Sequence, residues 1–275
     1  MRHSSPKGGT MSITCAVDAI TLDEIATVLI PAQVMIALDG IDIEYSIWER
    51  RRVMNADPQH TTLPAMSLAK ERLLPVVVLG EMVALPGIYP LKLLDIRPGR
   101  SNRAIRAARD GDNEVIMIFV PEQAIGNYRS SEPQSLPSIG VIARLVDLAS
   151  QPNGALEITM DVTTRAMITD RRQHDPYYLA TVVPYVDTEV TSTEIAALMA
   201  AVRAQVEAMA RTLAPYSTPE QIEEALTFMR QIDHAGQLAD FVTYSPVFTF
   251  AERTAILNAL DPMERLRLVQ RKLGA

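Results

Sequence analysis

Apolar and polar residues follow two different patterns along this chain, and the change falls near residue 188. From about Leu73 to Asp187, short apolar runs are separated by loops that contain Pro and Gly, which is typical of β-strands. After Asp187, Gly and Pro become rare and apolar residues recur at helical spacing. The pattern predicts an α+β fold, with a twisted, barrel-like β lobe containing one helix at residues 73–188 and a helical bundle at residues 189–275.

The β lobe opens with three apolar runs, followed by one helix and a further strand. The runs are Pro75–Leu79, Met82–Leu85 and Ile88–Leu94, with turns at Gly80-Glu81 and Pro86-Gly87 between them. Ser101 is predicted to cap an amphipathic helix that ends near Arg109, because serine is a favoured residue just before a helix. Val115–Val120 then resumes as a strand.

The helical part predicts one long helix and several shorter ones. Thr191 or Ser192 is placed to cap the first, Thr191–Ala214, and Thr218-Pro219 opens the second in the pattern of a cap followed by proline. Shorter helices are expected at Ala235–Val242, Thr249–Leu260 and Pro262–Leu273. The first helix carries apolar residues over more than one stripe, so part of its surface is expected to lie outside the bundle core, in a groove between the lobes.

Residues before the β lobe divide into three regions. Residues 1–11 form a polar leader that is predicted to be disordered, and Met11 leaves open where translation begins. Residues 12–54 predict a small α/β extension that docks on the β lobe, with Trp48 as a candidate anchor or a plain core residue. Its elements are a strand at Ile13–Val17, a helix from Thr21, and strands Val34–Leu38 and Ile41–Ile47 flanking the turn Asp39-Gly40. Residues 55–72 are predicted to be a linker.

The amino-acid composition of the chain excludes some classes of function. The chain has 275 residues, a formal charge of −7 and a single cysteine, Cys15. One cysteine excludes an internal disulfide and a thiolate-rich metal cage. The acidic balance opposes binding to phosphate polyanions. Nowhere do enough apolar residues run together to span a membrane or form a signal peptide, so a cytoplasmic protein without membrane partners is expected.

Arginine recurs at every third residue through the predicted helix of the β lobe, at Arg97, Arg100, Arg103, Arg106 and Arg109. Within the helix, Arg103, Arg106 and Arg109 should share one side, while Ile105 and Ala108 face the lobe. The three arginines are candidate anion-binding residues for an acidic peptide or a nucleic acid. The alternative is a solvated helix face, which the absence of interleaved aromatic residues and the acidic chain favour.

Sequence patterns of common catalytic centres are absent. The chain has no G-x-x-x-x-G-K-[ST], G-x-S-x-G, H-E-x-x-H or G-x-G-x-x-G. Its four histidines, His3, His60, His174 and His234, are dispersed and none lies at metal-ligand spacing from another. We therefore predict no catalytic residue, no metal site and no cofactor.

Several blocks of the sequence share the order and spacing of a known family. The first block comprises Leu74, Pro75, Leu79, Val83, Pro86, Gly87, Pro90 and Leu91, followed by Ser101, Ala104, Ile105 and Ala108. The later blocks are Ile139–Leu145 with the turn Pro152-Asn153-Gly154, Thr164–Ile168, Tyr177–Val182 and Gln237–Val269. Together they resemble the amino-terminal substrate-binding domain of the ATP-dependent protease Lon. The chain departs from that pattern at Gly80, where the family usually has Arg, and at Val162, where it usually has Gly.

The resemblance, which covers about Leu73 to Leu273, implies a PUA-like β lobe followed by a helical lobe. It implies a protein-binding module that captures unfolded or tagged protein segments, without an ATPase or protease centre of its own. Such a module could stand alone, partner a Lon-type ATPase–protease, or be the receptor part of a longer protease. Met199, Val202 and Met209 are the candidate substrate-binding residues if they are exposed; the alternative is that all three are core.

Two other function classes remain open at this stage. A nucleic-acid-binding regulator would use the PUA-like lobe and its arginines, although nucleic acid is the disfavoured partner. An enzyme in its own right would need a pocket with perturbed titratable groups, which the sequence does not indicate.

Overall fold

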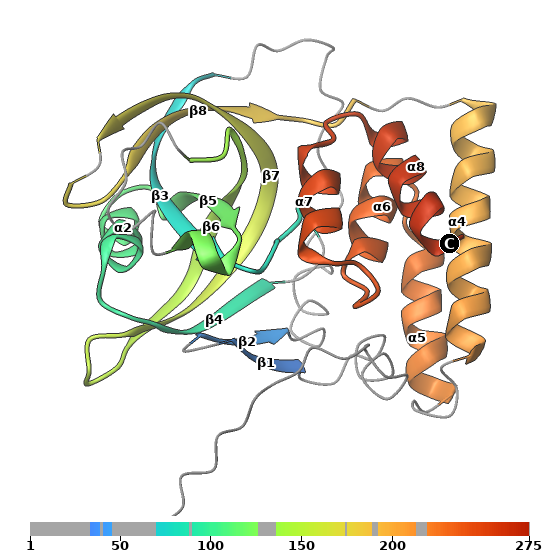
Figure 1. The fold of residues 1–275 in the computed structure, drawn as a ribbon, viewed down its shortest axis with the longest axis horizontal. Coiled ribbons are helices and arrows are strands. Elements are labelled where there is room, and N and C mark those ends of the chain that lie inside the picture. Colours follow the sequence, from blue (N-terminus) through green and yellow to red (C-terminus); the bar gives the residue numbers. More distant parts are fainter. Residues whose placement is uncertain are drawn as a thin grey trace, which may run out of the picture.

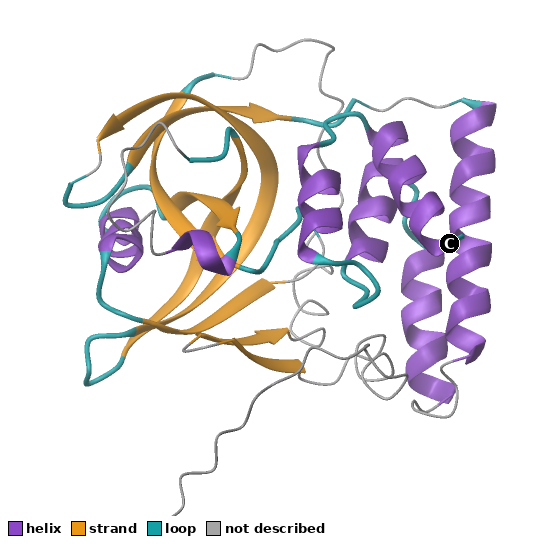
Figure 2. Ribbon diagram, in the orientation of Figure 1, coloured by secondary structure: helices purple, strands orange, loops and turns teal. Residues whose placement is uncertain are grey.

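The structure is a computed structural model that describes residues 34–38, 41–45, 70–87, 90–125, 136–173, 175–188, 192–212 and 219–274. Two lobes lie side by side, one built on a strongly curved sheet and the other on helices (Figures 1 and 2). The fold is therefore α+β, as the sequence predicts. The change of architecture falls between Tyr185 and Thr193, and the limits of the five predicted regions remain predictions.

One mixed sheet forms the β lobe. Its strands are β3 (Arg72–Gly80), β4 (Pro90–Ile96), β5 (Glu114–Val120), β6 (Ile139–Ser150), β7 (Leu156–Gln173) and β8 (Leu179–Tyr185), joined by β1 (Val34–Leu38) and β2 (Ile41–Tyr45). The order is β1-β2-β4-β7-β6-β5-β3-β8, and β7 also pairs with β8. That additional pairing closes β7, β6, β5, β3 and β8 into a ring. Among the described strand pairs, β3 and β5 run parallel and the others antiparallel.

The hairpin β1–β2 extends the sheet beyond this ring. The two strands pair antiparallel, and β2 pairs with β4 in the register Ile43↔Leu93. The extension therefore docks on the β lobe by main-chain pairing, as expected. The predicted leader, the strand Ile13–Val17, the helix from Thr21, the turn Asp39-Gly40, Trp48 and most of the linker lie outside the described residues.

Helix α2 (Arg100–Arg109) packs its apolar side into the β lobe. Ala104, Ile105 and Ala108 are buried there beside residues of β3 and β5, which confirms the predicted facing of the helix. The predicted role of Ser101 is wrong, because the residue before the helix is Gly99 and no side chain caps it. Ser101 instead lies inside the first turn. Its hydroxyl accepts a hydrogen bond from the Val78 N–H (3.1 Å) and donates one to the Val78 carbonyl oxygen (3.2 Å), so it ties α2 to β3.

The second apolar run, Met82–Leu85, forms no strand. These four residues are buried in the β-lobe core as an irregular segment that follows β3. Gly80, one of the two departures from the family pattern, lies at the end of β3. A Cβ atom at this position would meet the ends of the Ile125 and Glu122 side chains, which would have to move, because residues 122–125 form a helical turn across it. Val162, the other departure, is a buried core residue of β7.

Five described helices make up the second lobe: α4 (Thr193–Thr212), α5 (Pro219–Arg230), α6 (Ala235–Thr243), α7 (Phe250–Asn258) and α8 (Pro262–Leu273). Ser192 caps α4 by accepting a hydrogen bond from the Ile195 N–H. Thr249 forms a capping box with Glu252 at α7, and Asp261 caps α8 ahead of Pro262. These caps explain why the helix starts follow from the sequence.

Ser101→Ala tests the tie between α2 and β3. The substitution removes two hydrogen bonds and leaves the Val78 N–H and carbonyl without that partner, so we expect a loss of about 1–3 kcal/mol in the free energy of unfolding. Urea denaturation measures this loss. Ser138→Ala, at an exposed serine, is the matched control and should cost less than about 0.5 kcal/mol. Equal losses in both variants would contradict the anchoring role.

Candidate functional site

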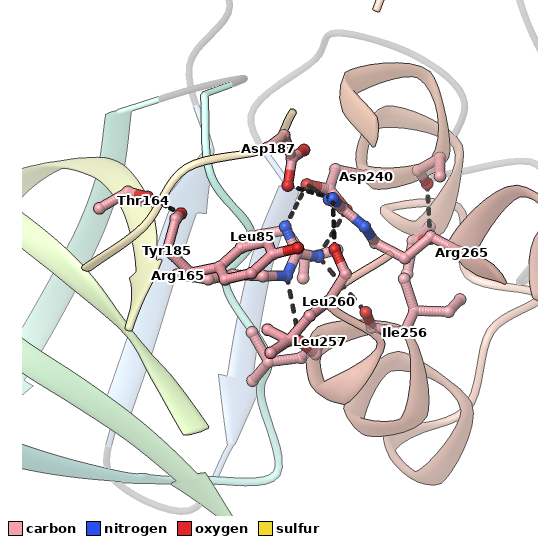
Figure 3. Close-up of polar contacts among 12 residues, drawn as sticks. Leu85, Thr164, Arg165, Tyr185, Asp187, Asp240, Ile256, Leu257, Leu260 and Arg265 are labelled. Atoms are coloured by element: carbon pink, nitrogen blue, oxygen red, sulfur yellow. Dashed lines mark hydrogen bonds and ion pairs between the residues drawn. The ribbon is translucent and has the colours of Figure 1, made fainter. Parts of the chain in front are cut away.

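A buried arginine of the β lobe joins the two lobes. Arg165 on β7 is 2% exposed, and its guanidinium donates two hydrogen bonds to the Asp240 carboxylate of α6 (Figure 3). The distances are 2.7 Å from Nη1 to Oδ2 and 2.7 Å from Nη2 to Oδ1. Arg165 Nε also donates to the Leu257 carbonyl oxygen on α7 at 3.0 Å. This bidentate geometry fixes the position and the angle of the helices against the sheet.

A second buried arginine completes the network. Arg265 on α8 donates from Nη1 to Asp240 Oδ2 at 3.1 Å, and from Nη2 to Asp187 on the segment that follows β8. Burial of the Arg265 guanidinium lowers its pKa, but Asp240 and Asp187 outweigh this, and the net pKa shift is upward. Gly236 faces the same group, and a Cβ atom there would collide with Asp187 and with the Arg265 guanidinium, about 3.0 Å from Nη1. We call Arg165, Asp187, Asp240 and Arg265 the joint.

Apolar packing reinforces the joint. Leu257 of α7 is buried in the β-lobe core, and Tyr244 and Phe250 pack against that core. The Tyr244 hydroxyl accepts a hydrogen bond from the Leu85 N–H (2.8 Å) and donates one to the Leu85 carbonyl oxygen (3.0 Å). The lobes therefore share both buried charges and core residues.

Beside the joint, the sheet presents exposed apolar side chains. Met167 on β7 pairs with Val183 on β8, and Leu73 on β3 pairs with Thr181 on β8. Because paired residues and alternate residues of a strand share a face, Leu73, Val183 and Met167 lie on one face of three neighbouring strands. Leu73 is 57% exposed and Met167 is 46% exposed. We call these three residues the apolar strip.

The apolar strip continues the face on which the joint lies. Arg165 is two residues before Met167, and the register carries no bulge between them, so both side chains leave the same face of β7. Helices α6 and α7 cover that face at Arg165 and leave it open at Met167. Val186, on the segment between β8 and the helices, is 66% exposed and adds apolar area nearby.

The three candidate substrate contacts on the first helix differ in how deeply they are buried. Met199 and Val202 are buried in the helical-lobe core, so the exposure on which their candidacy depended is not met and the alternative of core packing holds for these two. Met209 is half-buried, and its proposed contact with substrate stays a prediction. The wide apolar stripe of α4 is covered because α8 and α6 pack on it as well as α5. The exposed apolar residue next to the joint on β7 is Met167, which belongs to the sheet.

The predicted anion-binding arginines lie on the outside of α2. Arg103, Arg106 and Arg109 are all exposed, and none forms an ion pair with a carboxylate among the described residues. Their position is on the side of the β lobe away from the helical lobe (Figure 1), so they are not part of the joint or of the apolar strip. Whether they bind an anion remains a prediction.

The part of the chain that the structure describes contains neither a cluster of metal-ligating side chains nor a membrane-spanning helix. There, no three His, Cys, Asp or Glu side chains come together as they would around a metal ion. No described helix is both long and apolar enough to cross a bilayer. His234 is the residue before α6, and His3, His60 and His174 lie outside the described residues.

The joint was not predicted from the sequence. Part of its signal is a charged residue inside an apolar run, as at Arg165 in Thr164–Ile168 and Asp240 in the Gln237–Val242 run. Arginine and acidic residues are almost never fully buried unless they are paired, so these two residues point to one another. Arg265 carries no such signal, because α8 contains four other charged residues.

Comparisons with known proteins agree with this architecture. The family described as the ATP-dependent protease La (LON) substrate-binding domain matches residues 73–273. A Lon protease of Chloroflexus aggregans is 42% identical over 202 residues, which are 73% of this chain and 24% of that protein. A Lon protease of Chloroflexus aurantiacus is 30% identical over 221 residues, covering 80% of this chain and 26% of the relative. The chain therefore spans about a quarter of the length of these relatives.

A solved structure shares the fold. It is the N-terminal domain of a Mycobacterium avium complex Lon protease, with a TM-score of 0.58 and 21% sequence identity, covering 74% of this chain and 98% of the other. At this level of identity the comparison concerns the fold alone.

Asp240→Ala tests the joint. The variant leaves the Arg165 and Arg265 guanidinium groups buried without their shared carboxylate, and we expect it to lower the free energy of unfolding by about 3–5 kcal/mol. Chemical denaturation followed by circular dichroism measures the change. Glu194→Ala, which breaks the surface pair with Arg267, is the control and should cost no more than about 1 kcal/mol. A smaller loss for Asp240→Ala than for Glu194→Ala would show that the joint is not what holds the lobes.

Met199→Ala tests whether the Met199 side chain is buried in the helical-lobe core. Removing a buried methionine side chain leaves a cavity in the helical lobe, so the unfolding free energy should fall by roughly 2–5 kcal/mol. A thermal melt measures it, with Ala200→Ser on the exposed side of α4 as the control. An unchanged melting temperature for Met199→Ala would contradict the burial of this side chain in the helical-lobe core.

Proposed function

The chain belongs to the Lon substrate-binding domain family, and on this basis we propose that it recognises exposed apolar segments of unfolded or tagged proteins through the apolar strip beside the joint. The apolar strip, in which Leu73 and Met167 are exposed and Val183 is half-buried, is the observation that carries the proposal. Contiguous exposed apolar area on a soluble protein commonly marks an interaction site. Its partner must also present apolar side chains, as an unfolded segment does.

The character of the strip suits many different sequences. Apolar burial is non-directional, so it requires no particular pattern of hydrogen-bond donors in the ligand. The Met167 thioether is flexible and polarisable and can adapt to side chains of different shape. Three side chains bury little area, which supports weak and reversible capture of a segment rather than a permanent complex.

The joint gives this surface a fixed border. Because Arg165 and Asp240 lock the helices over one end of the sheet face, the open part of that face keeps its shape when no ligand is bound. A preformed surface avoids the entropic cost of ordering during binding. The joint therefore acts as a positioning element for the strip and makes no contact with the ligand in this proposal.

A larger role follows from the relatives. We propose that the module delivers captured segments to a Lon-type ATPase–protease, either within a longer chain or as a separate partner. ATP hydrolysis and peptide cleavage would then reside in other domains. The alternative of a nucleic-acid-binding regulator would rest on the exposed arginines of α2 rather than on the apolar strip.

Leu73→Ser combined with Met167→Ser tests the proposed recognition. Fluorescence anisotropy with a labelled, permanently unfolded model protein measures binding. Losing two partly exposed apolar contacts should weaken it roughly tenfold, at about 25 cal/mol for each Å² no longer buried. The melting temperature should barely move, since both side chains are exposed in the free protein.

Val146→Ser provides the matched control for this experiment. Val146 is 58% exposed on β6, outside the apolar strip, so its replacement should leave binding unchanged. The proposal fails if the unfolded protein does not bind the wild-type chain. It also fails if Val146→Ser weakens binding as much as the double variant does.

A further inference from the structure

Helix α2 has an unusual charge composition for an exposed helix. In ten residues it carries Arg100, Arg103, Arg106 and Arg109 and no acidic residue, although the chain as a whole has a formal charge of −7. Solvated helix faces usually mix charges of both signs. The helix lies on the outside of the β lobe, on the side away from the helical lobe (Figure 1).

Stability of the helix does not account for these arginines. Positive side chains in the first turn oppose the partial positive charge of a helix N-terminus, and Arg100 is the first residue of α2. Like charges three residues apart also repel along the helix surface. Arg106 and Arg109 in the last turn are favourable for the dipole, but Arg100 and Arg103 are not.

The exposed guanidinium groups are held in place without being neutralised. Arg103 Nε donates to the Pro176 carbonyl oxygen at 2.6 Å. Arg106 Nε donates to Asn102 Oδ1 at 3.1 Å, and its Nη2 lies 3.5 Å from the Gly154 carbonyl oxygen. These acceptors are uncharged, so each side chain keeps its full positive charge and has further N–H groups to offer. Because these contacts already restrict the arginine side chains, less of their conformational entropy is lost when a partner binds.

We propose that the outer face of α2 binds an acidic peptide segment, with Arg103, Arg106 and Arg109 as the contacts. Each guanidinium offers a planar fork that matches a carboxylate. The helix is about 15 Å long, which corresponds to roughly five residues of an extended peptide. Aspartate or glutamate at alternate positions of such a segment would face the helix together.

A peptide fits this face better than a nucleic acid does. Single-stranded nucleic acids bind by stacking bases on exposed aromatic rings between the basic residues. Among the described residues, the aromatic ring that pairs with an arginine of α2 is Tyr178, which is 2% exposed and lies under the Arg100 guanidinium, with 5.2 Å from the guanidinium carbon to the ring centroid. This surface is separate from the apolar strip, so the inference does not rest on the proposed function.

Binding of a fluorescein-labelled oligoglutamate peptide, long enough to span α2, tests the inference. At low ionic strength the wild-type chain should bind it, and R103Q/R106Q/R109Q should bind about tenfold more weakly. The control R172Q/R267Q/R271Q removes the same charge from exposed arginines elsewhere and should bind as wild type does. R103K/R106K/R109K keeps the charge without the fork and should fall between the two.

Four outcomes would overturn the proposal. The first is that the wild-type chain fails to bind oligoglutamate. The second is that the two glutamine triple variants weaken binding equally, which would indicate that net charge alone determines the affinity. The third is that an oligoglutamine peptide of the same length binds as well as oligoglutamate. The fourth is that a single-stranded RNA of similar length binds more tightly and loses affinity in R103Q/R106Q/R109Q, which would assign the face to nucleic acid. Circular dichroism melts of each variant confirm that the compared proteins are folded.

Discussion

The pairing of Arg165 with Asp240 is the constraint on which the arrangement of this molecule depends. A buried guanidinium is tolerated only with a partner, because removing a charge from water costs several kcal/mol. The partner comes from the other lobe, 75 residues along the chain. Arg165 thus finds its carboxylate in the other lobe, whereas Asp240 is shared between Arg165 and Arg265 of its own lobe. Such pairs contribute more to a defined geometry than to net stability, since apolar replacements of similar volume are often as stable.

Much of the fold follows from the local pattern of the sequence. Where the prediction differs from the structure, the difference has a physical cause. The helices of the second lobe start where Ser192, Thr249 and Asp261 provide side-chain caps, so their positions are visible in the sequence. Ser101 was misjudged because a serine near a helix start can also bond to a neighbouring strand, and Val78 is 23 residues away. The run Met82–Leu85 is as apolar as a strand but is buried without pairing, and apolar character alone does not distinguish the two.

The site was harder to predict than the fold because it depends on which elements meet. The wide apolar stripe of α4 indicates burial or exposure equally well, and the packing of α8 and α6 decides for burial at Met199 and Val202. The strip on the sheet arises from the register of three strands that are distant in sequence. Single-strand periodicity gives no register, so Leu73 and Met167 could not be placed on one face beforehand. The shared exposed side of the α2 arginines could be predicted because their spacing is local, and their binding of an anion stays a prediction.

Helix α7 contributes two adjacent residues to two different cores. Ile256 is buried among the helices, whereas Leu257 is buried among the strands of the β lobe. One turn of helix therefore belongs to both hydrophobic interiors at once. Because the two side chains are joined by one peptide bond, a rearrangement of either interior near α7 displaces a residue of the other, and the two interiors cannot be repacked independently at this turn.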